Sequence, residues 1–176
     1  KTGLITYHGP DLIFTFGLPM SPIIKENLMK TLFEGKVGQL HPNPNWKGLD
    51  ELNKNEKYEG WNCVRKGKAS GKLVGGNVNC LTNLENTDFR PDYKNSILFL
   101  EAYIATAEDL HQAFVHFRQA KIFDKVNGLI LGHFYGSRME VKAQDRKIAD
   151  IILEVIRDYS FPILEIGELG HNVENY

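Results

Sequence analysis

The sequence predicts an α/β domain with a mostly parallel sheet flanked by helices. Three largely apolar runs carry this prediction, at residues 96–101, 126–132 and 161–166. Runs of this kind are typical of strands that are buried on both faces, as in parallel sheets. Helical patterns separate the runs, so the second half alternates between strand and helix. Right-handed crossovers would then place the three strands side by side in one sheet.

The composition bounds the class of protein. The chain has 176 residues, a formal net charge of −1 and 42% hydrophobic residues, which is typical of a globular domain. It has no long cluster of Lys and Arg, so we expect no nucleic-acid partner. No segment approaches 18 consecutive apolar residues, so we expect no membrane span. Cys63 and Cys80 are too few for a disulfide framework or a metal site, which predicts reduced thiols in a cytoplasmic protein. We also expect no cofactor.

The first half of the chain is predicted to hold one helix and several short strands. Ser21 followed by Pro22 is a typical helix start, and Gly35 is a plausible terminator. Brief apolar patterns predict four short strands, at residues 4–7, 37–40, 61–64 and 72–74. The sequence begins without an initiator Met or a signal-peptide pattern, so we expect that it does not begin where its gene does.

Residues 41–60 form a polar stretch without periodicity, which is unusually long for a loop in a compact domain. Trp46 lies in this stretch. A large aromatic residue in a polar loop either packs back on the domain or stacks on a ligand, and the sequence leaves both interpretations open.

Gly75, Gly76 and Asn77 follow the strand at 72–74. A plain turn is the favoured interpretation, although paired glycines also let a backbone approach a ligand closely. Asn77 could then donate or accept a hydrogen bond. Residues 78–84 are expected to form a short helix or an irregular segment.

Two helices are predicted in the second half. Thr106 is an N-cap followed by acidic residues, and an apolar stripe extends the helix through Phe117. His111 and His116 do not share a helix face, and we interpret both as surface residues. The clearest helical pattern covers residues 145–159.

Charged and imidazole side chains follow the ends of the predicted parallel strands. On its own pattern, Glu101 is most simply a solvated strand cap. His171 follows the last strand, however, and parallel strands would bring it to the same sheet edge as Glu101. A carboxylate beside a histidine can fix the imidazole tautomer for general-base catalysis. His133, after the middle strand, is the competing histidine.

The sequence shows no nucleophile to complete such a pair. None of its serines lies in a Gly-x-Ser-x-Gly elbow or a comparable strand-to-helix turn. Neither cysteine has an evident activating neighbour. The chain alone therefore supplies two members of a possible triad.

Five blocks together resemble the LD-carboxypeptidases and the related microcin C immunity peptidases, and they occur in the same order. The blocks are residues 1–10, 75–77, 95–101, 126–134 and 170–171. The resemblance implies a serine peptidase with a Ser-Glu-His triad, in which Glu101 and His171 match the triad glutamate and histidine. It also implies that Asn77 and Trp46 bind substrate, that no metal is needed, and that the intact protein is a homodimer.

The resemblance implies a division of the chain as well. Residues 1–35 would be a linker and helix remnant after a Rossmann-like domain, whose Gly-x-Ser-Asp turn would hold the nucleophile. Residues 36–176 would be a C-terminal α/β domain of the swivelling β/β/α type. Three departures stand out: Ala102 replaces the usual Asp, residues 111–113 replace an Asp-Arg pair, and a final strand is missing after Tyr176.

The long loop with Trp46 favours the immunity-peptidase branch, which hydrolyses an amide between an aminoacyl group and a modified nucleotide. One alternative is a murein LD-carboxypeptidase that removes terminal D-alanine from muropeptides. Another is a non-catalytic ligand-binding domain. Under either peptidase hypothesis the substrate is a small peptide or a peptidyl-nucleotide. The present chain alone is expected to be inactive.

Overall fold

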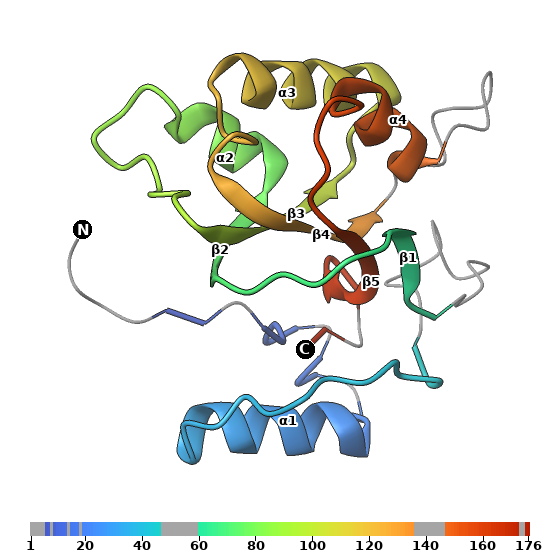
Figure 1. Ribbon diagram of the computed structural model, residues 1–176. Helices are drawn as coiled ribbons and strands as arrows, with labels where there is room; N and C mark the ends of the chain where they lie inside the picture. The colour runs from blue at the N-terminus through green and yellow to red at the C-terminus, as the bar shows by residue number, and fades with distance from the viewer. Residues whose placement is uncertain are drawn as a thin grey trace.

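The described strands of the computed structural model form one five-stranded sheet in the order β1-β5-β4-β3-β2 (Figure 1). The structure describes residues 6–7, 9–13, 15–17, 19–46, 60–135, 147–172 and 175–176. The strands are β1 (Asn62–Arg65), β2 (Lys72–Asn77), β3 (Ser96–Tyr103), β4 (Val126–Tyr135) and β5 (Ile163–Gly170). The helices are α1 (Pro22–Phe33), α2 (Val78–Leu84), α3 (Ala107–Gln119) and α4 (Ile148–Val155).

Strands β2, β3, β4 and β5 are parallel to one another, and β1 joins the edge antiparallel to β5. The prediction of a mostly parallel α/β sheet is therefore confirmed. Helices α2, α3 and α4 lie together on one face of the sheet, whereas α1 lies on the other side (Figure 1). All parallel strands end at the same edge, which collects the residues that follow them.

The main core lies between the sheet and the helices α2, α3 and α4. On β3, Leu98, Leu100 and Ala102 belong to this core, together with Phe114 of α3 and Ile152 of α4. Ala102 is fully buried there. Because side chains alternate along a strand, Ala102 faces the helices and Glu101 faces the opposite side of the sheet. The departure at Ala102 therefore changes the core and not the face that carries Glu101.

Two predicted helix starts are confirmed in detail. The Ser21 hydroxyl accepts from the Ile24 amide at 3.5 Å, with Pro22 as the first helical residue. Thr106 and Asp109 form a capping box, in which each side chain accepts from the other residue's amide at 3.1 Å. Caps of this kind satisfy amides that have no partner within the helix.

Several element boundaries differ from the predictions. Residues 37–40 form no strand, and Val37 is exposed. Residues 6–7 are not in a strand, while residues 4–5 lie outside the described residues. Helix α4 ends at Val155, short of the predicted end at 159, and residues 145–146 also lie outside the described part. His116, expected at the surface, is half-buried on α3.

The plain turn expected at Gly75-Gly76-Asn77 is wrong. Strand β2 continues to Asn77, which pairs in register with Glu101 of β3, and α2 begins at the next residue. A Cβ atom at Gly75 would lie 1.9 Å from the Phe99 carbonyl oxygen. The glycine therefore allows the close approach of β2 and β3 that brings Asn77 to the level of Glu101.

Candidate functional site

Glu101 and His171 form a direct pair at the carboxyl end of the parallel strands. Glu101 Oε2 lies 2.5 Å from His171 Nδ1. The Glu101 side chain is 1% exposed, whereas the His171 side chain is 39% exposed. The solvated-cap interpretation of Glu101 is therefore wrong. A buried carboxylate holds one ring nitrogen of a histidine that remains open to solvent, which is the arrangement that orients a general base.

The contact between Glu101 and His171 spans the strand that lies between them, β4. Glu101 is on β3 and His171 follows β5, so β4 lies between them. A Cβ atom at Gly132 of β4 would lie 3.2 Å from Glu101 Cβ and 2.6 Å from a ring carbon of Phe99. A Cβ atom at Gly170 would lie 3.0 Å from Glu101 Cβ. The missing side chains at these two glycines leave the space through which Glu101 reaches His171.

The pairing between β4 and β5 is irregular next to Glu101 and His171, and this irregularity sets the direction in which β5 ends. From Leu131 to His133, β4 advances two residues while β5 advances five, from Glu165 to Gly170. Gly170 adopts φ +117°, a conformation that L-residues rarely adopt. Bulges of this type redirect side chains next to functional sites. The five-residue excursion of β5 turns the chain so that His171 lies over the end of β4.

The electrostatics of the pair favour the protonated imidazole. The hydrogen bond with the Glu101 carboxylate raises the pKa of His171 above its ordinary value of 6.5. Partial burial lowers the pKa by less, and the negative charges of Glu101 and Asp11 raise it further. Glu101 Oε1 is buried and accepts no hydrogen bond from any described residue. The His171 imidazole is thus the described group that balances the negative charge of the buried Glu101 carboxylate.

A row of aromatic rings extends from His171 along the sheet edge. Tyr103 lies 4.9 Å from His171 between ring centroids, and it stacks on Tyr135 at 4.9 Å with an interplanar angle of 4°. Tyr135 neighbours His133 at 6.5 Å, and His133 meets the edge of Trp46 at 5.3 Å. The sequence pattern does not single out the two tyrosines. The signal for Tyr103 was its spacing of two residues from Glu101, which places both on one face of β3.

The backbone after Tyr103 is strained. Ile104 adopts φ +46°, which is rare for a β-branched residue, and its amide donates to the Tyr135 carbonyl at 2.8 Å. Strain of this kind is found where the surrounding structure fixes a functional geometry. Here it ends β3 directly beside the ring that covers His171.

Trp46 packs back on the domain, one of the two interpretations that the sequence left open. Its indole Nε1 donates to the Gly167 carbonyl at 3.1 Å. The residue is half-buried, so part of the ring surface stays accessible. Residues 47–59 of the predicted loop lie outside the described residues. Trp46 therefore ends the aromatic row that begins at His171, while His133 serves as a link in this row and not as the partner of Glu101.

Asn77 caps helix α2. Its side-chain oxygen accepts from the amides of Asn79 at 3.1 Å and Cys80 at 3.3 Å. This cap explains an Asn after the paired glycines, because Asn is among the preferred N-cap residues. The capping role leaves the side-chain NH₂ group as the part of Asn77 that could bind a ligand. Its main chain lies beside Glu101 in the β2–β3 ladder.

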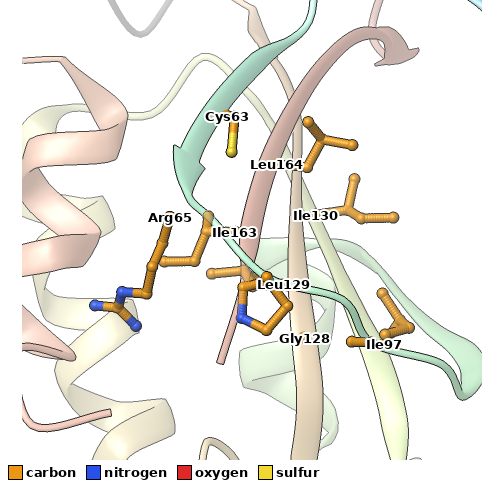
Figure 2. Close-up of a pocket in the computed structure, with 11 residues that line it drawn as sticks. Cys63, Arg65, Ile97, Gly128, Leu129, Ile130, Ile163 and Leu164 are labelled. Carbon is orange, nitrogen blue, oxygen red and sulfur yellow. The ribbon is translucent and has the colours of Figure 1, made fainter. Parts of the chain in front are cut away.

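A separate cavity of about 270 Å³ lies away from this site (Figure 2). Its lining includes Ile97, Ile130 and Leu164, which lie in the first halves of their strands, whereas Glu101 and His171 lie at the other ends. Arg65 at its border donates to the carbonyls of Ile156 and Phe161. The cavity is mainly apolar and contains neither member of the pair, so it is not the candidate active site.

The described residues form neither a cluster of metal ligands nor a membrane-spanning helix. Across these parts of the chain, no cluster of three or more His, Cys, Asp or Glu side chains could hold a metal ion. Within the same residues, no helix combines the length and the apolar character needed to cross a bilayer.

The chain has relatives among known protein families and structures. A family model described as the LD-carboxypeptidase C-terminal domain matches residues 70–176. The chain is 29% identical, over an alignment of 185 residues including gaps, to the microcin C7 self-immunity protein MccF of Escherichia coli, covering 97% of this chain and 53% of that protein. It is 26% identical over 175 residues to the "Probable murein peptide carboxypeptidase" of Bacillus subtilis, covering 97% and 49%.

Solved structures give the same relationship. A structure of MccF in complex with aspartyl sulfamoyl adenosine aligns with a TM-score of 0.76 and 27% identity, over 97% of this chain and 54% of that one. A structure of MccF with glutamyl sulfamoyl guanosine aligns with a TM-score of 0.76 and 26% identity, with the same coverage. The chain thus spans about half the length of the relatives it matches.

Proposed function

This chain belongs to the LD-carboxypeptidase C-terminal domain family, and we propose that it supplies the glutamate and histidine of a Ser-Glu-His triad to a serine peptidase. The observation that carries the proposal is the 2.5 Å contact between buried Glu101 and partly exposed His171. The nucleophilic serine of the proposed triad lies in an upstream domain, within a Gly-x-Ser-Asp turn.

The proposed mechanism follows from the two ring nitrogens of His171. When Nδ1 carries a proton and donates to Glu101, Nε2 holds the lone pair that can accept the serine proton. The serine oxygen then attacks the scissile carbonyl, and Glu101 stabilises the imidazolium that forms. His171 next returns the proton to the leaving amine, and water releases the acyl group by the same route. Upstream backbone amides are the proposed oxyanion donors.

The proposed substrate is an amide between an aminoacyl group and a modified nucleotide. MccF has been solved with aminoacyl sulfamoyl nucleosides, which supports this class. Trp46 would stack on the nucleobase with its accessible ring surface, and the NH₂ group of Asn77 would donate to a substrate oxygen. The row of rings from Trp46 to His171 supports a site that holds a planar group at some distance from the reacting bond.

A murein LD-carboxypeptidase is the second candidate. The 26% identity to the Bacillus subtilis protein favours it. Its substrate, a muropeptide ending in D-alanine, contains no planar base, so Trp46 would then contribute little to binding. A non-catalytic binding domain is the third reading, and the short Glu101–His171 distance argues against it.

We further propose that the intact protein is a cytoplasmic homodimer that acts without a metal or other cofactor. Residues 1–35 serve in this proposal as linker and helix remnant, and residues 36–176 as the C-terminal domain. The present chain alone would be inactive because it lacks the nucleophile.

A substrate panel on the intact protein tests these proposals. We expect hydrolysis of an aminoacyl sulfamoyl adenosine, and at least about a tenfold rise in KM on Trp46→Ala from the loss of base stacking. Release of D-alanine from a muropeptide, unaffected by Trp46→Ala, would instead establish the second candidate. An upstream coding sequence without a Gly-x-Ser-Asp turn would contradict the serine mechanism itself.

A further inference from the structure

Glu168 is a buried carboxylate that the proposed mechanism does not use. It is completely buried and lies three residues before His171. Its Oε1 accepts from the main-chain amide of Asn43 at 2.6 Å, and its Oε2 accepts from the indole Nε1 of Trp61 at 2.9 Å. The carboxylate therefore ties two segments far apart in the sequence to the strand that precedes His171.

The segment beginning at Asn43 forms a tight turn that ends at Trp46. Asn43 is buried, and its side-chain oxygen accepts from the Asn45 amide at 3.0 Å. The Trp46 amide donates to the Asn43 carbonyl at 3.1 Å, and the Trp46 indole donates to the Gly167 carbonyl at 3.1 Å. Holding the Asn43 amide thus fixes where Trp46 lies.

Strand β5, whose Gly167 and Glu168 accept these hydrogen bonds, is itself fixed by further hydrogen bonds. Gly167 and Glu168 belong to the excursion of β5, and their carbonyls accept from the Asn172 side chain and the Tyr176 amide, both at 3.0 Å. The same short stretch continues into Gly170 and His171. Glu168 is therefore built into the element that presents the histidine, while its carboxylate reaches the turn that presents Trp46.

We propose that Glu168 is a positioning residue for substrate recognition, which fixes the Trp46 turn at a constant place relative to His171. This inference rests on the proposed function only where substrate affinity is concerned. The docking of Trp46 by Glu168 can be measured on its own. A carboxylate is needed because N–H donors of two described residues, Asn43 and Trp61, face its two oxygens, and both oxygens can accept. Glutamine would turn its NH₂ group toward one of those donors.

The first test measures docking by fluorescence. Trp46 and Trp61 are the two tryptophans of the chain, so Trp61→Phe leaves Trp46 as the single reporter. In this background, Glu168→Ala should shift Trp46 emission to the red and increase acrylamide quenching about twofold, since a buried anchor is removed. Glu165→Ala is the matched control, because Glu165 lies on the same strand and accepts from exposed Asn62. Unchanged emission and quenching in folded Glu168→Ala would overturn the proposal.

Glutamine gives a second variant that retains the shape of the side chain. With Trp61 present, Glu168→Gln should release Trp46, because one donor meets the new NH₂ group. In the Trp61→Phe background that donor is gone, and the remaining oxygen can still accept from Asn43. Trp46 quenching should then return to the level of Trp61→Phe alone. Because Trp61 emission would overlap that of Trp46 in Glu168→Gln alone, quenching is compared within the Trp61→Phe background. Quenching of Glu168→Gln about twofold above that of Trp61→Phe alone would contradict the proposed role, even if Glu168→Ala does not fold.

The third test uses turnover of the intact protein. Glu168→Gln should raise KM about tenfold, the effect of one lost buried hydrogen bond to a charged group, and leave kcat within about threefold. Adding Trp61→Phe should restore KM, and Glu168→Gln should have no further effect when Trp46 is already alanine. A fall in kcat at constant KM, or additive effects with Trp46→Ala, would refute the recognition role. Fluorescence still decides docking if the proposed substrate is not hydrolysed.

Discussion

Glu101 and His171 differ greatly in their exposure, and this difference defines their roles. The carboxylate is buried and cannot move to other partners, whereas the imidazole keeps one edge open. The Tyr103 ring packs against the His171 ring, with 4.9 Å between the ring centroids. A fixed anion behind an accessible imidazole is what a general base requires, since the anion sets the tautomer and stabilises the cation.

The pH dependence of the intact enzyme tests the pair. His171 must be neutral to accept a proton, and Glu101 raises its pKa above 6.5. We therefore expect kcat/KM to rise with pH through that raised value. Glu101→Gln removes the charge, so the rise should move to lower pH while the plateau falls at least about a hundredfold. An unchanged midpoint in Glu101→Gln would show that another group controls the rise.

The same pKa shift predicts a contribution to stability. The raised folded pKa means that the charged pair stabilises the fold fully below 6.5, and this contribution is lost as pH rises through the folded value. Urea unfolding of His171→Gln should therefore differ more from the native chain at about pH 6 than at about pH 9. An equal difference at both values would contradict the charged pair.

At the scale of elements, two glycines, Gly132 and Gly170, leave the space in which Glu101 contacts His171. Gly132→Ala would place a Cβ atom 2.4 Å from the Leu169 carbonyl oxygen and 2.6 Å from the Phe99 ring. We expect a loss of about 1–3 kcal/mol in the free energy of unfolding, because the strands must separate. The separation should also lengthen the Glu101–His171 contact and reduce kcat/KM.

Gly9→Ala is the control for this substitution, since its nearest contact would be an ordinary one, 3.8 Å away at the Tyr176 carbonyl oxygen. Urea denaturation and turnover measured on both variants check the prediction. Equal stability and activity of the two would show that the close approach at Gly132 is not needed.

Element patterns explain what the sequence could and could not predict. Capping residues and apolar periodicity are local, so the helices after Ser21 and Thr106 were predicted correctly. The ends of β3 and β5 depend on pairing across the sheet, and the predicted strands stopped at Glu101 and at residue 166. Tyr103 and Glu168 lie just beyond those limits, which is why both were missed. Their positions follow from bulges that no local pattern reports.

At the scale of the whole molecule, parallel topology brings the distant pair together. Glu101 and His171 are 70 residues apart, and the parallel strands β3, β4 and β5 put both at one sheet edge. This convergence could be predicted, because three strands separated by helices leave few topologies. The docking of the 43–46 turn could not, since it depends on the buried Glu168 carboxylate and on Trp61.

The core also indicates what the chain can do alone. The face of the sheet under α2, α3 and α4 holds a continuous apolar cluster, which is the basis of a folded domain. Exposed apolar side chains gather instead on α1 and near it, including Met29, Leu32 and Phe33. We therefore expect the chain to fold while lacking the proposed nucleophile.

Turnover of the intact protein with His171 replaced by alanine tests the central claim most directly. We expect His171→Ala to lower kcat/KM at least about a thousandfold, with an unchanged circular dichroism spectrum. We also expect the purified 176-residue chain to be inactive. Activity within about tenfold of the native enzyme in folded His171→Ala would contradict the assignment of this histidine as the general base.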